Sequence, residues 1–227
     1  MKILAIDTAT ESCSVALKVG EQTLSRQEIA PRGHAQRVLP MVDDILAEAG
    51  VSLSQLDGIA FDRGPGAFTG IRIGTSVVQG LAFGADLPVI PVSSLCTLAQ
   101  GTYRSGHYTN VLAVIDARMQ EVYWAYCQLN DSSTMELIDA EHVSNADRIS
   151  VCPEGEWYGA GTGWQTYAES IQVNCNRLLG YQAEVFPLAK DVISLAEPQL
   201  AKGLGVSAEQ ALPVYIRDEV AWKKQTP

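Results

Sequence analysis

Residues that could do metal or phosphate chemistry follow two apolar runs in this chain. Asp7 directly follows the run Lys2 to Ile6 and opens the polar stretch DTATESCS, residues 7–14. A carboxylate and threonines at the end of a buried strand can hold a hydrated metal ion or meet a phosphate group. Asp116 ends a similar run, VLAVID, in the second half of the chain. The alternative is ordinary turn chemistry, because Asp, Thr and Ser are common in turns.

A glycine-rich loop, RGPGAFTG at residues 63–70, lies between a predicted strand and a predicted helix. The strand is the apolar run 58–61, and the helix is expected to begin with Thr69 as its N-cap and to end near Phe83. Backbone N–H groups at such a helix start can face an anion. No Gly-Lys-Ser/Thr sequence closes the loop, so it differs from the Walker motif. The alternative is a tight turn that binds nothing.

A second glycine loop, GAGTG at residues 159–163, also lies between a predicted strand and a predicted helix. Phosphate transfer between two lobes needs metal-holding carboxylates and phosphate loops from both of them. Asp7 and Asp116 are the carboxylates in matching places, and neither loop offers a phosphate-binding lysine. We therefore expect a degenerate cleft, in which Asp7, Asp116 and Gly161 are vestigial cofactor-binding positions. An ATPase or phosphotransferase is the enzymatic alternative.

The histidines offer little support for a hydrolase. The chain has three of them, His34, His107 and His142, and none stands in a GxSxG or HExxH context. A Ser-His-Asp site assembled from distant residues is the remaining route to a peptidase, which is the weaker alternative. We expect no catalytic residue and no metal site.

Composition sets the outer bounds. The 227 residues allow one large domain or two small ones, and 47% of them are hydrophobic, as in ordinary globular proteins. A formal net charge of −10 repels phosphate backbones, so strong binding to nucleic acid by this chain alone is not expected. No apolar run approaches the roughly 20 residues that span a bilayer. Five widely spread cysteines without a CxxC pair indicate reduced thiols and a cytoplasmic location.

Hydrophobic periodicity predicts alternating strands and helices in both halves of the chain. In the first half, strands are expected at 2–6, 14–19, 22–29, 58–61 and 87–92, and helices at 34–49, 69–83 and 94–103, the last capped by Ser93. In the second half, strands are expected at 111–116, 121–128, 135–142, 156–158 and 183–186. Helices are expected after Ser144, at 163–171 and, capped by Asp191, to about 202. Residues 174–181 are predicted as a loop or irregular helix, 213–217 as extended chain and 218–227 as a polar tail that is mobile at its end.

Each half therefore begins with a strand, an Asp-containing turn and a second strand. Such an internal duplication predicts two related lobes. The polar, turn-rich stretch 101–110 separates them, so we place an N-terminal lobe at 1–105 and a C-terminal lobe at 106–227.

Helices 34–49 and 69–83 carry wider apolar arcs than packing on one sheet requires. In the first helix, the core stripe is expected from Ala35, Leu39, Val42, Leu46 and Ala49. In the second, Ile71, Val78, Leu81 and Ala82 are expected to face the sheet. Gly74 and Gly80 would let another helix approach, since glycine inside a helix costs about 1 kcal/mol relative to alanine.

These arcs predict a surface for a second protein, and burial within the same chain is the alternative. The partner-contacting residues are predicted to be His34, Arg37, Val38, Met41, Ile45, Thr69, Arg72, Ile73, Ser76, Val77 and Gly80. A homodimer through the same patch is expected when the partner is absent, because exposed apolar patches find matches.

Five sequence blocks together resemble the bacterial TsaB (YeaZ) family. They are ILAIDTATESCSVAL, HAQRVLPMVDDIL, GPGAFTGIRIG, IDARMQEVYW and PVYIRDEVAWKK, and they follow one another in the order of the family over almost the whole chain. The resemblance implies an α/β, two-lobed actin/sugar-kinase/Hsp70-type ATPase fold built from duplicated ribonuclease H-like lobes. It also implies a non-catalytic relative of the TsaD enzyme.

The resemblance further implies a role with TsaD and the ATPase TsaE. Together they are expected to make N6-threonylcarbamoyladenosine (t6A) at position 37 of tRNAs that read codons beginning with A. ATP would be used by the complex through TsaE, and tRNA would be contacted only through the complex. The two long helices of the N-terminal lobe are expected to pack against TsaD.

Two residues depart from what a phosphate loop would need. Ala67 stands where the family usually has serine in GPGSFTG, which removes a hydroxyl from the loop. Asp62 places a carboxylate beside the loop and disfavours a bound phosphate. Both departures weaken a nucleotide role for the loop and leave the helix-packing role intact.

Overall fold

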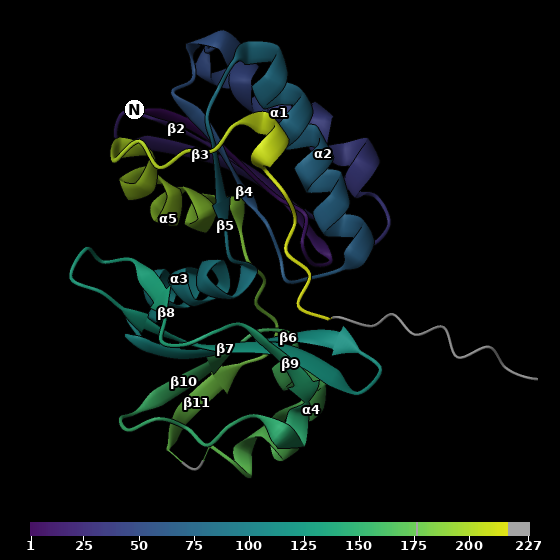
Figure 1. Cartoon of the computed structure of the whole chain (residues 1–227), viewed down its shortest axis with the longest axis vertical. Coiled ribbons are helices and arrows are strands. Elements are labelled where there is room, and N and C mark those ends of the chain that lie inside the picture. Colours follow the sequence, from purple (N-terminus) through teal and green to yellow (C-terminus); the bar gives the residue numbers. More distant parts are fainter. Residues whose placement is uncertain (176, 218–227) are drawn as a thin grey trace, which may run out of the picture.

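The computed structural model describes residues 1–175 and 177–217. It contains two β-sheets, and the first has strand order β3-β2-β1-β4-β5 (Figure 1). Its strands are β1 (Lys2–Asp7), β2 (Ser12–Val19), β3 (Gln22–Ile29), β4 (Gly58–Asp62) and β5 (Val89–Val92). Strands β1, β2 and β3 are antiparallel neighbours, and β4 and β5 run parallel to β1.

The second sheet repeats this arrangement. Its order is β11-β10-β6-β7-β8, and β9 also pairs with β7. Its strands are β6 (Asn110–Arg118), β7 (Glu121–Leu129), β8 (Met135–Leu137), β9 (His142–Asn145), β10 (Trp157–Ala160) and β11 (Leu178–Gln182). In each sheet an antiparallel hairpin comes first, and two parallel strands extend the sheet from the first strand of that hairpin. The predicted internal duplication is confirmed.

The helices form layers around the two sheets. Helices α1 (His34–Ala49) and α2 (Phe68–Ala85) cover the outer face of the first sheet, and α5 (Ala189–Ala201) packs on its inner face. Helix α3 (Ser94–Gly106) packs on the second sheet and against α5, and α4 (Gly163–Gln172) packs on the opposite face of that sheet. Figure 1 shows these layers from top to bottom: helix pair, sheet, α5, α3, sheet and α4.

Side-chain alternation along the strands explains the layers, since successive residues point to opposite faces of a sheet. In β1, Leu4 and Ile6 belong to the cluster under α1 and α2, whereas Ile3 and Ala5 belong to the cluster around α5. That second cluster continues through α5 and α3 to the second sheet, so the lobes share one core. The division into lobes 1–105 and 106–227 stays a prediction. Helix α5 belongs to the second of these ranges but packs on the first sheet.

Several predicted element ends are corrected by the structure. Helix α2 begins at Phe68 with Ala67 as N-cap, so Thr69 lies in the first turn. Helix α5 has Leu188 as N-cap, and Asp191 lies inside it. By contrast, the predicted cap Ser93 is confirmed, because its hydroxyl accepts a hydrogen bond from the Cys96 N–H at 3.2 Å.

The second half holds the larger differences. The strand predicted at 135–142 is two short strands, β8 and β9, which both pair with β7. The strand predicted at 183–186 is absent, and β11 lies instead in the stretch predicted as loop or irregular helix. Gly180, with φ of +153°, lies where β11 pairs irregularly with β10, so this strand lacks a regular alternating pattern. The predicted tail 218–227 lies outside the described residues.

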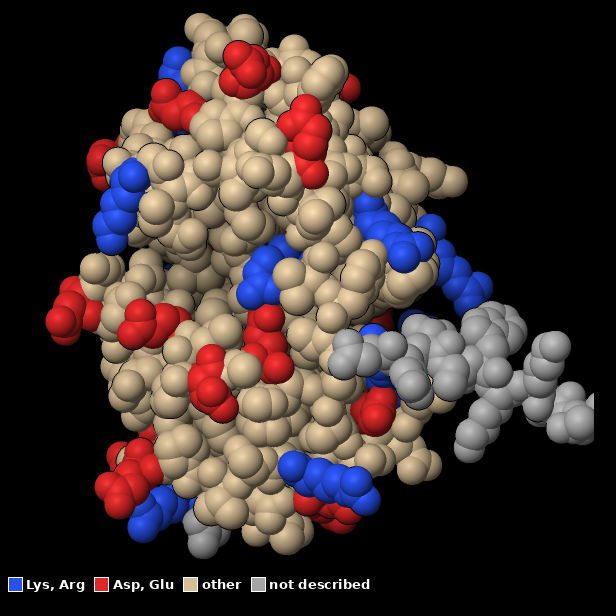
Figure 2. Space-filling model, in the orientation of Figure 1, with Lys and Arg blue, Asp and Glu red and all other residues tan. Residues whose placement is uncertain are grey.

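Three short 3-10 helices complete the described chain: η1 (Leu53–Gln55), η2 (Ala146–Arg148) and η3 (Ala208–Gln210). The structure assigns no strand or helix to the segment 211–217, which was predicted as extended chain. Within the described residues, no helix has both the length and the apolar character needed to cross a membrane. On the face drawn in Figure 2, basic side chains are scattered among acidic ones and form no continuous basic surface.

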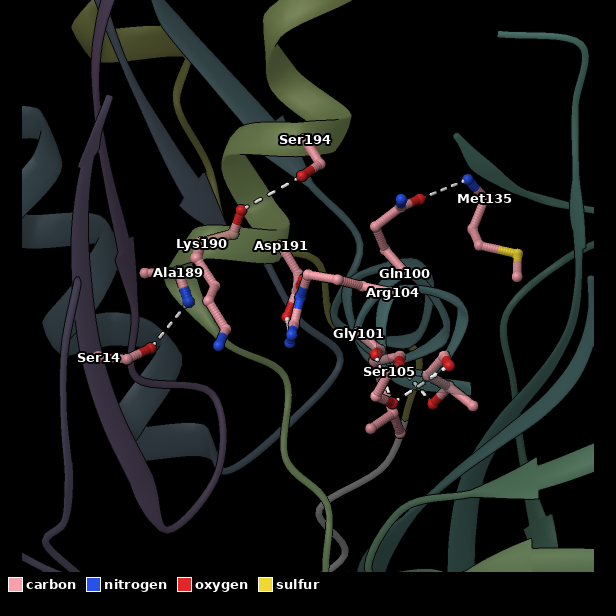
Figure 3. A network of polar contacts seen from close by, with 12 residues as sticks. Ser14, Gln100, Gly101, Arg104, Ser105, Met135, Ala189, Lys190, Asp191 and Ser194 are labelled. Carbon is pink, nitrogen blue, oxygen red and sulfur yellow. Dashed lines mark hydrogen bonds and ion pairs between the residues drawn. The ribbon is translucent and has the colours of Figure 1, made fainter. Parts of the chain in front are cut away.

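A polar joint ties α5 to its neighbours in the middle of the molecule (Figure 3). The guanidinium of Arg104 on α3 donates to both carboxylate oxygens of Asp191 on α5, at 2.7 and 3.2 Å. Ser14 on β2 accepts from the first N–H of α5, that of Ala189, at 2.8 Å. Gly101 leaves room for this pair, because a Cβ there would lie 2.9 Å from an Asp191 oxygen.

Substituting Arg104→Ala should leave the fully buried Asp191 carboxylate without its cation and lower the free energy of unfolding. We expect a loss of about 2 kcal/mol, less than for a fully buried pair because the Arg104 side chain is 44% exposed. Urea unfolding measures the loss. The matched control is Arg26→Ala, which removes an exposed ion pair with Glu48 and should cost less than about 1 kcal/mol. Equal losses in the two variants would contradict a structural role for the joint.

Candidate functional site

The carboxyl ends of β1 and β4 bring Asp7 and Asp62 together. The strands are parallel neighbours in a register that pairs Ile6 with Phe61, so the two aspartates follow at the same level. Both side chains are buried. Asp7 Oδ1 accepts from the Ala9 N–H at 2.9 Å, and Asp62 Oδ1 accepts from the Gly64 N–H at 3.0 Å and from the Ser94 hydroxyl.

The second oxygen of each carboxyl group, Oδ2, has no donor among the described residues. The two carboxyl groups contact one another, and they can form a hydrogen bond only if one of them keeps its proton. Burial and the Asp62 charge raise the pKa of Asp7 well above its usual value. Burial also raises the pKa of Asp62, to about 6, against the donors Ser94 and Gly64. Asp7 is therefore the group that holds the proton.

In this protonation state the ionised member of the pair repels a phosphate group, and a metal ion would have to displace the shared proton. No group of three or more His, Cys, Asp or Glu that could hold a metal ion occurs among the described residues. The pair joins β1, β4 and the start of α3, because Asp62 also accepts from Ser94.

The glycine loop uses its glycines to pack against the turn that follows β1. A Cβ on Gly66 would lie 2.3 Å from the Ala9 carbonyl oxygen, and one on Gly70 would lie 2.1 Å from that of Thr8. The Ala67 N–H at the start of α2 donates to the Ala9 oxygen at 2.7 Å. The chain's own turn thus accepts from the N–H of the N-cap residue of this helix. These contacts support the interpretation of the loop as a tight turn.

The second glycine loop packs in the same way. Gly161 has φ of +114°, and a Cβ there would lie 2.3 Å from the Val114 carbonyl oxygen on β6. Asp116 is exposed, and its Oδ1 accepts from the Arg118 N–H of the same hairpin at 2.7 Å. No hydrogen bond or ion pair between Asp116 and Asp7 occurs within the described part of the chain. In the described residues each of these two aspartates accepts from the backbone of its own turn.

Four residues predicted to contact a partner lie in the interior. His34, Val38, Met41 and Ile45 are buried, and the last three belong to the core cluster under α1. Their inclusion in a partner surface was wrong. Ala35 and Leu39, predicted to face the core, are exposed instead. Helix α1 is thus rotated about its axis relative to the prediction, because its apolar residues fill more than one face.

Helix α2 keeps most of its predicted surface. Thr69, Arg72, Ser76 and Gly80 are exposed and follow one another at spacings of three and four. Ile73 and Val77 are half-buried and pack against the core cluster. Arg37 on α1 is exposed but is held by Glu28, with an Nη2–Oε2 distance of 2.6 Å.

Exposed aromatic residues extend this surface and were missed from the sequence. Phe83 continues the spacing beyond Gly80 and is 74% exposed. Phe68 carries the Arg72 guanidinium 3.6 Å from its ring centroid, and Tyr215 accepts from Arg72 Nε at 2.7 Å. We call Thr69, Arg72, Ser76, Gly80 and Phe83 the α2 stripe. Phe83 could have been predicted as part of this surface, because it follows Gly80 at helical spacing. Tyr215 could not, because it is distant in sequence from α2.

The predicted role of Gly74 also needs correction. A Cβ on Gly74 would lie 2.5 Å from Thr8 Oγ1, so this glycine admits the turn after β1 rather than another helix. Gly80 and Gly84 differ, because a Cβ on either would meet no atom within 4 Å. Nothing in the described part of the chain explains these two glycines.

The two matching sheets and the helices packed between them define an actin/sugar-kinase/Hsp70-type fold with duplicated lobes. The family model described as TsaD, tRNA N6-adenosine threonylcarbamoyltransferase, matches residues 19–225. The chain is 45% identical to the tRNA threonylcarbamoyladenosine biosynthesis protein TsaB of Escherichia coli, over 99% of this chain and 98% of the relative. It is 40% identical to TsaB of Haemophilus influenzae, over 99% and 97% of the two chains.

Two solved structures are similar to this chain in both fold and sequence. YeaZ from Pseudomonas aeruginosa superimposes with a TM-score of 0.89 at 52% identity, over 94% of this chain and 99% of that one. A second crystal structure, of an uncharacterized protein described as similar to peptidase YEAZ from Pseudomonas aeruginosa, gives 0.90 at 51% identity, over 95% and 99%. The chain belongs to the TsaB (YeaZ) family, within the wider TsaD-type fold.

The shared proton of Asp7 and Asp62 makes stability depend on pH. Because the pKa of Asp7 is raised in the folded protein, its contribution is full below the unfolded value near 4 and is lost as pH rises. Asp7→Asn supplies a donor to Asp62 that does not titrate. Above pH 5, the free energy of unfolding of this variant minus that of the wild type should therefore increase by up to about 1.4 kcal/mol per pH unit. Urea unfolding from pH 5 to 8 measures this gain.

Asp44→Asn, at an exposed position on α1, is the matched control and should follow wild type at every pH. A constant difference between Asp7→Asn and wild type across the range would contradict a shared proton.

Proposed function

We propose that this chain is a non-catalytic subunit in the formation of N6-threonylcarbamoyladenosine at position 37 of tRNAs that read codons beginning with A. It binds TsaD through the α2 stripe and activates it, and TsaE joins the complex and uses ATP. The relatives named for threonylcarbamoyladenosine biosynthesis, which match nearly the whole chain, carry the proposal. With TsaD absent, the same stripe pairs with a second copy of this chain.

The open glycines of α2 support a helix as the partner's contacting element. Glycine inside a helix costs about 1 kcal/mol relative to alanine, and Gly80 has no packing reason among the described residues. A helix from another protein can approach closely over a glycine. The exposed Phe83 and the stacked Phe68–Arg72 pair flank this position and supply aromatic and cationic contacts, which are enriched at interfaces.

A nucleotide-using enzyme is the alternative that the fold itself suggests. Phosphate transfer requires backbone N–H groups and carboxylates that are free to meet phosphate and metal. Here the Ala67 N–H is used by the Ala9 oxygen, and Asp7 faces Asp62. These contacts favour a subunit that leaves chemistry to others. The net charge of −10 favours a subunit that contacts tRNA only through the complex.

A peptidase is the weaker alternative. His34 is buried in α1, and His107 lies in the left-handed conformation that ends α3. His142 stacks on Trp124 and lies 3.7 Å from Asp139. No hydrogen bond joins any of these histidines to a serine in the described parts of the chain, so a nucleophile and base pair is not assembled.

Reconstitution tests the proposal. Purified TsaD, TsaE, ATP, threonylcarbamoyl-AMP and tRNA are incubated with and without this chain, and modified adenosine is measured. We expect product that depends on this chain, and no ATP hydrolysis by this chain alone. Metal-dependent hydrolysis by the isolated chain that is lost in Asp7→Ala would overturn the proposal and establish an enzyme.

Gly80→Arg should weaken binding to TsaD by at least tenfold without unfolding this chain. The new side chain points into open space, and arginine favours the helix more than glycine does, so stability should be unchanged or higher. Val77, half-buried in the core, is a poorer site because its substitution would mix folding with binding. Titration calorimetry with TsaD measures the affinity.

Gln165→Arg is the matched control, because it adds the same charge at an exposed position on α4 in the other lobe. It should bind TsaD like wild type. Unchanged affinity of a folded Gly80→Arg variant would eliminate the α2 stripe as the docking surface.

A further inference from the structure

Two thiol groups of the second lobe lie near one another, far along the chain from the α2 stripe. Cys152 lies in the segment between η2 and β10, and Cys175 follows α4. The Cys152 N–H donates to the Asn174 carbonyl oxygen at 3.3 Å, which holds the two segments side by side. Both thiol groups are free, and they lie close enough for each to shift the pKa of the other.

A tyrosine completes this cluster. The Tyr126 hydroxyl on β7 lies 3.1 Å from Cys175 Sγ and donates to the Ser150 carbonyl oxygen at 2.9 Å. A hydrogen bond from the Cys152 thiol lowers the pKa of Cys175 to about 7, although burial opposes it. Cys175 is therefore substantially a thiolate near neutral pH, the form that reacts with oxidants.

A second thiol pair in the same chain provides a contrast. Cys96 on α3 and Cys127 on β7 also lie close together, in the core that the two lobes share. Cys175 is buried as well, in the core of the second lobe, so the two pairs differ in the segments that carry them. Cys96 and Cys127 belong to a regular helix and a regular strand, so bonding their sulfurs would strain two packed elements. Cys152 is partly exposed and lies in a segment without regular structure, which can adjust to disulfide geometry.

We propose that Cys152 and Cys175 are a redox-responsive pair that hydrogen peroxide converts into a reversible disulfide. The Cys175 thiolate attacks one peroxide oxygen, the O–O bond breaks, and a sulfenic acid and hydroxide form. The Cys152 sulfur then attacks the sulfenic sulfur, and water leaves as the S–S bond forms. In total, two thiols lose two protons and two electrons, and one peroxide is reduced to two waters.

The disulfide fastens the irregular segment before β10 to the end of α4. It closes a loop over residues 152–175, which restricts the unfolded chain and stabilises the fold. Thiols such as dithiothreitol reverse it by exchange. Because the pair lies in the second lobe, the modification leaves the α2 stripe unchanged and is independent of the proposed function.

The full-length chain, purified under reducing conditions, is exposed to hydrogen peroxide, then alkylated and digested for mass spectrometry. We expect the peptides of Cys152 and Cys175 to be joined within one chain, with the Tm raised by several degrees and restored by dithiothreitol. Cys152→Ser should abolish the cross-link and the Tm shift, and it remains informative if Cys175→Ser fails to fold. Cys96→Ser, the matched control, should keep both responses.

Each of the following outcomes would overturn the proposal. One is a cross-link between Cys96 and Cys127 in place of the expected one. Another is a Cys152 cross-link between two chains, detected as a reducible dimer. The third is an unchanged number of free thiols, or oxidation to sulfinic acid without any disulfide, at peroxide concentrations that oxidise a reference dithiol peptide.

Discussion

A single apolar core joins the two sheets of this protein. Helix α3 comes from the first half of the chain but packs on the second sheet, and α5 comes from the second half but packs on the first. One apolar cluster therefore runs from β1 through both helices to β6. Apolar burial contributes about 25 cal/mol per Å², so separating the lobes would expose a large part of the interior. The Arg104–Asp191 ion pair and the Asp62–Ser94 hydrogen bond lie at this junction.

Packing inside the molecule limits which groups remain available at the surface. Gly66 and Gly70 of the glycine loop pack directly against the backbone of the turn after β1. Burial raises the pKa of Asp7, so that Asp7 and Asp62 share a proton. What remains free is the outer face of α2, whose Gly80 has no neighbour. A fold associated with phosphate transfer thus presents an exposed helix face, to which the proposed function assigns the partner contact.

Some positions were predictable because their signal is local. The repeated pattern of apolar run and aspartate in ILAID and VLAVID predicted two related lobes, and the structure confirms them with matching strand orders. The same kind of run ends at Asp62 in GIAFD, which placed a second carboxylate beside the glycine loop. The glycines of the loop pack on Thr8 and Ala9. This contact was not predictable, because it joins segments about 60 residues apart.

The alternation of strands and helices, the duplication, the family resemblance and the spacing of Thr69, Arg72, Ser76 and Gly80 on α2 can be read from the sequence alone. All of these depend on neighbouring residues or on ordered motifs. Tertiary structure decided which face of α1 is buried, since Val38, Met41 and Ile45 compete with Ala35 and Leu39 and only the sheet beneath selects between them. It also decided that Asp7 keeps a proton and that Cys152 meets Cys175, because burial and contact between distant segments exist only after the chain has folded.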